Sequence, residues 1–155
     1  MIMGLLLMKS LPLTPRAMVL VDSSIWIEAF RREGSVHVKL AVKGLLDEYE
    51  AALCSPVRLE VLGGARKEER AKLGRNFDIL PYVALVEEDW AAAVKLSWRL
   101  REAGQVVKWN DILIATVALR KGMRVYAQDK HFQIMNQVLG LSLYTPGYNG
   151  LYNPE

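Results

Sequence analysis

The sequence predicts an α/β fold, a three-layer sandwich in which a central, mainly parallel sheet is flanked by helices on both faces. Two short apolar runs, 19–21 and 51–54, lack the polar alternation of half-exposed strands, which is typical of parallel strands buried on both faces. Segments with helical periodicity alternate with these runs. The 155 residues, 52% of them hydrophobic, suffice for one domain with a sizeable core.

We expect most of the chain to form this single domain. Residues 18–146 contain every predicted helix and strand, so we assign them to the folded domain. Residues 1–17 are interpreted as an N-terminal extension outside the fold, and 147–155 as an irregular C-terminal tail. The apolar run at the N-terminus ends at Lys9, too soon to span a membrane, and a signal peptide is the alternative interpretation. No membrane association is expected.

Charge and cysteine content restrict the partners and the compartment. The formal net charge is +3 and the sequence pI is near 9.0, which permits a polyanionic partner without requiring one. Cys54 is the only cysteine, so it cannot form an intramolecular disulfide. Its apolar neighbours indicate a core residue and not a nucleophile. A reducing cytoplasm is therefore the expected location.

In the first half of the domain, two strands are each followed by helices. Asp22 closes the first strand, and Ser23 or Ser24 is expected to cap the next helix, which ends before Gly34. Pro56 lies near the start of the helix that follows the second strand, as is common in a first helical turn. The elements expected here are the strands 19–21 and 51–54 and the helices 24–32, 38–46 and 57–62.

In the second half, a charged stretch leads into a helix, a weak strand follows, and a long helix begins at acids that suit the positive end of its dipole. The next helix is apolar nearly all round, which predicts burial on every side, and Asp111 lies in its first turn. Asp129 closes the last strand. The elements expected here are the charged stretch 66–70, the strands 79–82 and 124–128, and the helices 87–103 and 111–119.

Four acids occupy matching places in this pattern. Asp22 and Asp129 each close a strand, Asp111 opens a buried helix, and Glu60 interrupts an apolar helical turn. Carboxylates that converge at one sheet edge raise one another's pKa, and a divalent cation resolves this conflict. Oxygen ligands without several Cys or His favour Mg²⁺ or Mn²⁺ over Zn²⁺. Such a site suits phosphodiester hydrolysis by a metal-activated water.

The acids lie in four ordered segments, 21–27 (VDSSIWI), 55–65 (SPVRLEVLGGA), 110–118 (NDILIATVA) and 129–132 (DKHF). This ordered set resembles the PIN domain and, within it, the VapC-like toxins. The resemblance extends over residues 18–144, and its specificity lies in the order and spacing of the four segments together. It implies a metal-dependent ribonuclease fold in which Asp22, Glu60, Asp111 and Asp129 are the metal ligands and catalytic residues.

The resemblance also implies a cellular role. It indicates an endoribonuclease that is the toxin of a type II toxin–antitoxin system, with RNA as substrate and Mg²⁺ or Mn²⁺ as cofactor. A cognate antitoxin would lay a segment in an apolar groove near the site, and a homodimer is expected. Trp109 is a candidate for stacking on a base. The candidates for holding the RNA backbone are Arg31, Arg32, Arg58 and Lys130.

Three residues beside the acids are candidate supporting residues. Ser23 lies where the family has a small hydroxyl after the first acid, Asn110 directly precedes the third acid, and Arg58 lies two residues before the second. Ala127 departs from the family pattern, which commonly has Ser or Thr two residues before the last acid. This substitution weakens the expectation of a second metal ion more than the expectation of activity.

Other interpretations stay open on the sequence alone. Each acid could be a helix cap or a salt-bridge partner, with Arg58 nearest to Glu60, which would suit a catalytically silent PIN-fold binding module. A nuclease of RNA processing that is not a toxin is a further alternative. Haloacid-dehalogenase chemistry also begins at a strand-ending Asp but needs a second Asp where Ser24 stands. His131 is interpreted as an ordinary helix-start residue and not as a general base.

Overall fold

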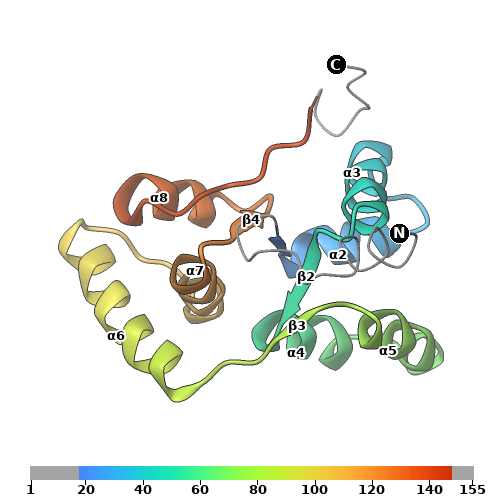
Figure 1. Cartoon of the computed structure of the whole chain (residues 1–155), viewed down its shortest axis with the longest axis horizontal. Coiled ribbons are helices and arrows are strands. Elements are labelled where there is room, and N and C mark those ends of the chain that lie inside the picture. The colour runs from blue at the N-terminus through green and yellow to red at the C-terminus, as the bar shows by residue number, and fades with distance from the viewer. Residues whose placement is uncertain (1–17, 148–155) are drawn as a thin grey trace, which may run out of the picture.

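The computed structural model describes residues 18–147 and contains one four-stranded sheet (Figure 1). The expected N-terminal extension, and the expected tail beyond Gly147, lie outside the described residues. The strand order is β3-β2-β1-β4, and every pairing is parallel, which confirms the predicted sheet. The strands are β1 (Val19–Val21), β2 (Ala51–Cys54), β3 (Tyr82–Val83) and β4 (Arg124–Tyr126).

Helices connect the strands in the order that the sequence predicted, and one further helix, whose range was not among the expected elements, follows the last strand. They are α2 (Ser23–Phe30), α3 (Val36–Asp47), α4 (Ser55–Gly63), the 3-10 helix η2 (Lys67–Glu69), α5 (Arg70–Asp78), α6 (Glu87–Glu102), α7 (Trp109–Lys121) and α8 (Lys130–Leu139). Figure 1 shows α6, α7 and α8 to the left of the sheet and α3 and α5 to its right. The three-layer arrangement is therefore confirmed.

The order of the strands determines where a site can form. The chain proceeds from β1 through β2 to β3 and then returns to β4, on the other side of β1. In parallel α/β sheets, such a reversal leaves a crevice beyond the carboxyl ends of the two strands that flank it. Here those strands are β1 and β4, and they are followed by Asp22 and by Asp129 respectively.

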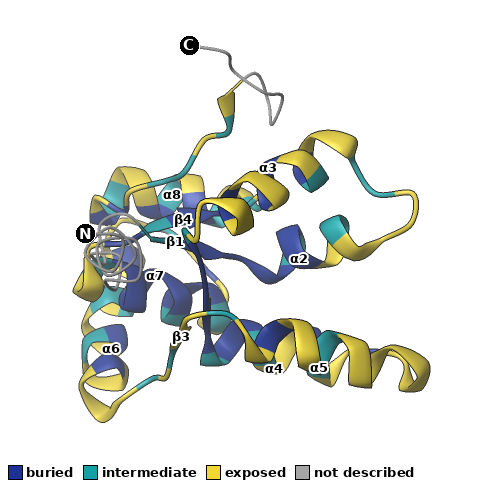
Figure 2. Ribbon diagram, turned by 45° about the vertical axis from the view of Figure 1, so that its right-hand side comes forward, coloured by how far each residue is buried: buried dark blue, intermediate teal, exposed yellow. Residues whose placement is uncertain are grey.

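The core explains why these segments became strands and a central helix. Val19, Leu20 and Val21 are fully buried, as expected for a strand covered on both faces. Helix α7 is also buried on most sides, and Ile114 and Val117 are fully excluded from solvent. Figure 2 shows α7 in the colour of buried residues over much of its length, while the outer faces of α5 and α6 are exposed.

Two of the predicted strands were too long. The last one was expected at 124–128, but β4 ends at Tyr126 because its neighbour β1 ends at Val21, and the Tyr126 carbonyl accepts the final ladder bond from the Asp22 N–H. The weak strand was expected at 79–82, but β3 covers only Tyr82 and Val83. Pro81 has no N–H to donate, and only its carbonyl joins the ladder, at 2.9 Å from the Leu53 nitrogen.

An ion pair between a buried acid and a partly exposed arginine joins α6 to α7. Asp89, in the first turn of α6, is fully buried, and its Oδ1 contacts the Arg120 guanidinium. Its Oδ2 accepts a hydrogen bond of 2.9 Å from the Val86 N–H, just before the helix. The Asp89 carboxylate is thus neutralised by a cation and satisfied by a backbone donor. Within residues 18–147, no helix combines the length and apolar character that a bilayer crossing requires.

Candidate metal centre

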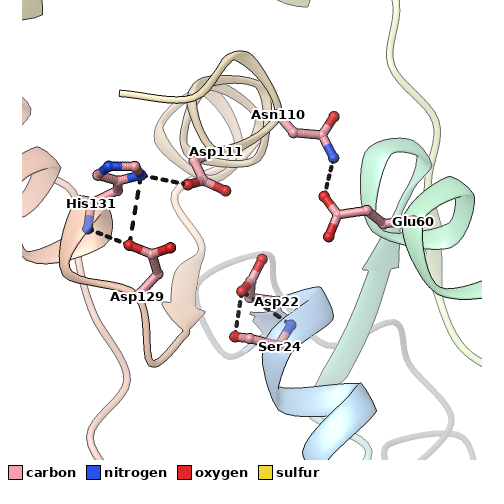
Figure 3. Close-up of polar contacts among 7 residues, drawn as sticks. All are labelled: Asp22, Ser24, Glu60, Asn110, Asp111, Asp129 and His131. Carbon is pink, nitrogen blue, oxygen red and sulfur yellow. Dashed lines mark hydrogen bonds and ion pairs between the residues drawn. The ribbon is translucent and has the colours of Figure 1, made fainter. Parts of the chain in front are cut away.

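Three carboxylates reach the crevice from three different elements (Figure 3). Asp22 caps the N-terminus of α2, where its Oδ2 accepts hydrogen bonds from the Ser24 hydroxyl at 2.6 Å and the Ser24 N–H at 3.3 Å. The sequence suggested Ser23 or Ser24 as the cap of α2, but the cap is Asp22 itself. Asp129 caps α8 in the same way and accepts from the His131 N–H at 2.9 Å. Asp22 directly follows β1, whereas Asp129 lies three residues beyond the end of β4 and so does not close that strand as predicted. Both acids combine a cap position with a place beyond the carboxyl end of a strand.

Asp111 lies in the first turn of α7 as predicted, but it does not cap the helix. The cap position belongs to Lys108, which makes no side-chain cap hydrogen bond. Instead, Asp111 Oδ2 lies 2.9 Å from His131 Nδ1. The same imidazole nitrogen lies 3.6 Å from Asp129 Oδ1. One ligand atom from each of Asp111, Asp129 and His131 can be chosen so that all lie within 4.8 Å of one another.

His131 is the residue that sequence reasoning missed. Its position at the start of α8 was predicted correctly, but its contact with two acids was not. The available signal was its spacing, two residues after an acid that follows a strand and caps a helix. In that position the histidine backbone binds the capping carboxylate, and its ring can reach the same side of the sheet.

Glu60 faces the same space from α4, but its surroundings differ from the prediction. Helix α4 buries Val57 and Val61, which are one turn apart, so Glu60 and its neighbour Leu59 are exposed. Glu60 therefore carries no burial cost, contrary to the expectation of an acid inside an apolar turn. The Asn110 side-chain amide donates a hydrogen bond to Glu60 Oε1 and links α4 to α7 at the site (Figure 3).

Arg58 does not accompany the acids. Its guanidinium lies 3.6 Å from Asp78 Oδ1 and over the Tyr82 ring, 5.3 Å from the centroid. The suggested ion pair between Arg58 and Glu60 is therefore wrong, because the Arg58 head group is engaged at α5 and β3. Of the supporting candidates, the structure joins Asn110 to Glu60 and keeps Ser23 directly beside Asp22.

No lysine or arginine that the structure describes forms an ion pair with the acids at the crevice. Among residues 18–147, none of Asp22, Glu60, Asp111 and Asp129 has a Lys or Arg nitrogen within 4.0 Å. Burial raises the pKa of Asp22, despite the donors from Ser24, and the nearby charge of Asp111 raises it further. Burial also raises the pKa of Asp111, against the lowering effect of its hydrogen bond to His131. Keeping Asp22 and Asp111 ionised in the folded protein therefore costs free energy.

The donor set fits a divalent cation that prefers oxygen. Four carboxylates surround the space, and a single imidazole lies beside two of them (Figure 3). Ser23 adds a second indication, because its buried hydroxyl has no hydrogen-bond partner among the described protein groups, as expected of a group that meets bound water. Cys54 supplies no ligand, since burial raises the pKa of its thiol to about 12. Mg²⁺ or Mn²⁺ suits these donors better than Zn²⁺.

The raised pKa of Asp22 predicts how stability depends on pH. Because the folded state favours the protonated carboxyl, the metal-free protein loses stability as the pH rises from about 4 through that raised pKa. Asp22→Asn keeps the cap but cannot ionise, so we expect this variant to melt at a higher temperature than the wild type at neutral pH without metal. The difference should shrink toward pH 4, as measured by thermal melts across that range.

Adding Mg²⁺ provides the control for this prediction. The wild type should gain stability from the ion, whereas Asp22→Asn should gain much less because it has lost one ligand charge. If the variant instead melts below the wild type at every pH without metal, Asp22 is a structural cap and not an acid held at a cost.

Comparisons with known proteins agree with this geometry. A family model described as the PIN domain matches residues 19–137. The chain is 35% identical over 129 residues to the VapC ribonuclease Mb1587 of Mycobacterium bovis, and the match covers 80% of this chain and 96% of that protein. The ribonuclease VapC11 of Mycobacterium tuberculosis gives the same identity and coverage.

Solved structures show the same fold at lower identity. FitAcB from Neisseria gonorrhoeae has a TM-score of 0.69 and 16% identity, with 84% of this chain and 99% of that chain covered. VapBC2 from Rickettsia felis, bound to a DNA fragment from its promoter, also has a TM-score of 0.69, with 18% identity and coverage of 82% and 97%. The sheet order, the family model and the sequence identity agree, and the chain belongs to the PIN-domain family, in its VapC branch.

Proposed function

We propose that the chain is a Mg²⁺- or Mn²⁺-dependent endoribonuclease and the toxin of a type II toxin–antitoxin pair. The observation that carries this proposal is the group of Asp22, Glu60, Asp111 and Asp129 at the carboxyl edge of a parallel sheet, without a lysine or arginine partner in the described part of the chain. The names of the VapC ribonucleases that share 35% identity support the same activity.

The four carboxylates would hold the cation. A divalent ion bound there lowers the pKa of a water molecule and offsets charge on the scissile phosphate. The residues around the acids prepare this site. Ser24 fixes the Asp22 carboxylate, His131 orients Asp111 at 2.9 Å, and Asn110 holds Glu60 toward the space that the acids share.

Removing the metal tests the activity directly. We expect the purified protein to cleave single-stranded RNA with Mg²⁺ or Mn²⁺ and to lose this activity in excess chelator, because the acids alone repel the phosphate backbone. Restoring Mg²⁺ should restore the rate in the same sample, as followed by gel analysis of a labelled RNA. Cleavage that continues unchanged in chelator contradicts a metal-dependent reaction at these acids.

We further propose that an antitoxin protein blocks this site. The structures with a similar fold include a toxin–antitoxin complex from Klebsiella pneumoniae and a DNA-bound VapBC from Salmonella typhimurium. On this chain, Leu59, which directly precedes Glu60 on α4, is 73% exposed. Ile27 and Phe30 of the neighbouring α2 are also exposed, which suits the apolar face of a partner segment.

The chain itself is also proposed to form a homodimer, an expectation that rests on the resemblance to the family. A stripe of exposed apolar residues on α6, Trp90, Val94 and Trp98, suits contact with another protein surface.

A further inference from the structure

A cavity of about 340 Å³ opens beside the acids, at the junction of α6, α7 and α8. Leu100 and Ile112, which are both buried, form part of its apolar lining. Trp109 also lines the cavity and is 68% exposed. Arg101 and Lys108 bring two cationic side chains to it. The cavity thus combines an apolar lining, an accessible aromatic ring and positive charge.

The cavity adjoins the candidate metal centre through a shared side chain. His131 is among its lining residues, and the same side chain places Nδ1 2.9 Å from Asp111 Oδ2. Trp109 also lies only two residues before Asp111, at the start of α7. A chain of RNA whose phosphate lies at the acids therefore passes the cavity within the adjacent nucleotides.

The charge of the residues that line the cavity indicates which kind of ligand it binds. None of the ten residues that line the cavity is acidic, whereas the neighbouring centre consists of four acids. Arg101 and Lys108 attract phosphates and oppose a basic peptide segment. Trp109 offers a flat, exposed ring, and unstacked bases of single-stranded RNA stack on such rings. Gln105, half-buried in the lining, can accept from and donate to a base edge.

We propose that this cavity is a nucleobase subsite, which takes one unstacked base of the RNA next to the phosphate at the acids. Trp109 stacks on the base, and Arg101 and Lys108 hold the flanking phosphates. The inference rests on the proposed ribonuclease function and adds a residue, Trp109, that positions the nucleotide beside the cleaved bond.

Affinities measured without metal distinguish the contribution of the bases from that of the phosphate backbone. The probes are fluorescently labelled octa-adenylate and an abasic RNA octamer with the same phosphates, both titrated in EDTA so that neither is cleaved. Wild type should bind octa-adenylate about 5- to 150-fold more tightly than the abasic octamer, the range expected for one stacked base. Trp109→Ala should lose most of this difference and bind the abasic octamer as the wild type does, while Trp109→Phe keeps most of it.

The chain offers a matched control. Tyr49 is 77% exposed and does not line the cavity, so Tyr49→Ala removes an equally accessible aromatic ring without touching the subsite. This variant should bind both probes as the wild type does. Arg101→Gln should weaken both probes equally and reduce the slope of log affinity against log salt by about one, because it removes a phosphate contact.

The outcomes separate this inference from the function on which it rests. If Trp109→Ala binds octa-adenylate as tightly as the wild type, while the wild type still cleaves RNA with Mg²⁺, the subsite is wrong and the ribonuclease stands. If Trp109→Ala changes only the oligomeric state measured by light scattering, the cavity is a contact between copies of the chain. If the wild type neither binds nor cleaves RNA, the proposed function fails together with the subsite.

Discussion

Asp111→Asn is expected to lower the rate of Mg²⁺-dependent RNA cleavage by at least ~100-fold, because changes that only touch a ligand's neighbours already cost 10–100-fold. In the wild type, His131 Nδ1 lies 2.9 Å from Asp111 Oδ2. Asn has the shape of Asp, so its side-chain oxygen can still face this nitrogen. What the variant lacks is the negative charge. Asp111 is not the cap of α7, so no cap interaction is lost, and because burial raises the pKa of Asp111 the melting temperature without metal should not fall.

The control for this variant is Glu88→Gln. Glu88 also lies in the first turn of a long helix, α6, but it is exposed, and its neighbour Asp89 pairs with Arg120 in the last turn of α7, whereas Asp111 lies in the first turn. Neutralising Glu88 should leave the cleavage rate unchanged. Single-turnover rates and thermal melts of both variants measure the two effects separately. If purified Asp111→Asn cleaves RNA at the wild-type rate, the four acids are not the active site and a binding module becomes the better interpretation.

Arg120→Ala is expected to destabilise the fold by about 3 kcal/mol, the low end for buried ion pairs, because it leaves the buried Asp89 carboxylate without a cation that is itself partly exposed. Asp89 is fully buried in the first turn of α6, and the Arg120 guanidinium on α7 is its ion-pair partner. A loss of this size lowers the melting temperature by on the order of 10 °C. Urea denaturation followed by circular dichroism gives the free energy of unfolding of variant and wild type.

An exposed ion pair provides the comparison. Lys43 Nζ lies 2.7 Å from Asp47 Oδ2 on the surface of α3, and both side chains are more than half exposed. Lys43→Ala should change the free energy of unfolding by less than ~1 kcal/mol, since solvent screens such pairs. If Arg120→Ala costs no more than Lys43→Ala, the contact between α6 and α7 is maintained by apolar packing and the pair of Asp89 and Arg120 contributes little.

The order and burial of the elements followed from the sequence alone. A strand such as Val19–Val21 has no polar residue to expose, so its pattern predicts burial on both faces wherever it lies. The same reasoning predicted the buried helix around Asp111 and the acids Asp22 and Asp129 near strand ends. The burial of a strand and the start of a helix depend on residues only a few positions apart, so the sequence pattern contains them.

The tertiary structure decided which side chains meet. Glu60 was predicted to interrupt an apolar helical turn, but α4 turns Val57 and Val61 inward and leaves Glu60 exposed, where Asn110 from α7 reaches it. His131 contacts Asp111 because α8 packs against α7, and no local sequence pattern predicts this packing. The cavity beside Trp109 likewise forms only where three helices leave space between them. Periodicity determines which face of an element is buried, but the partners across that face depend on how the whole chain packs.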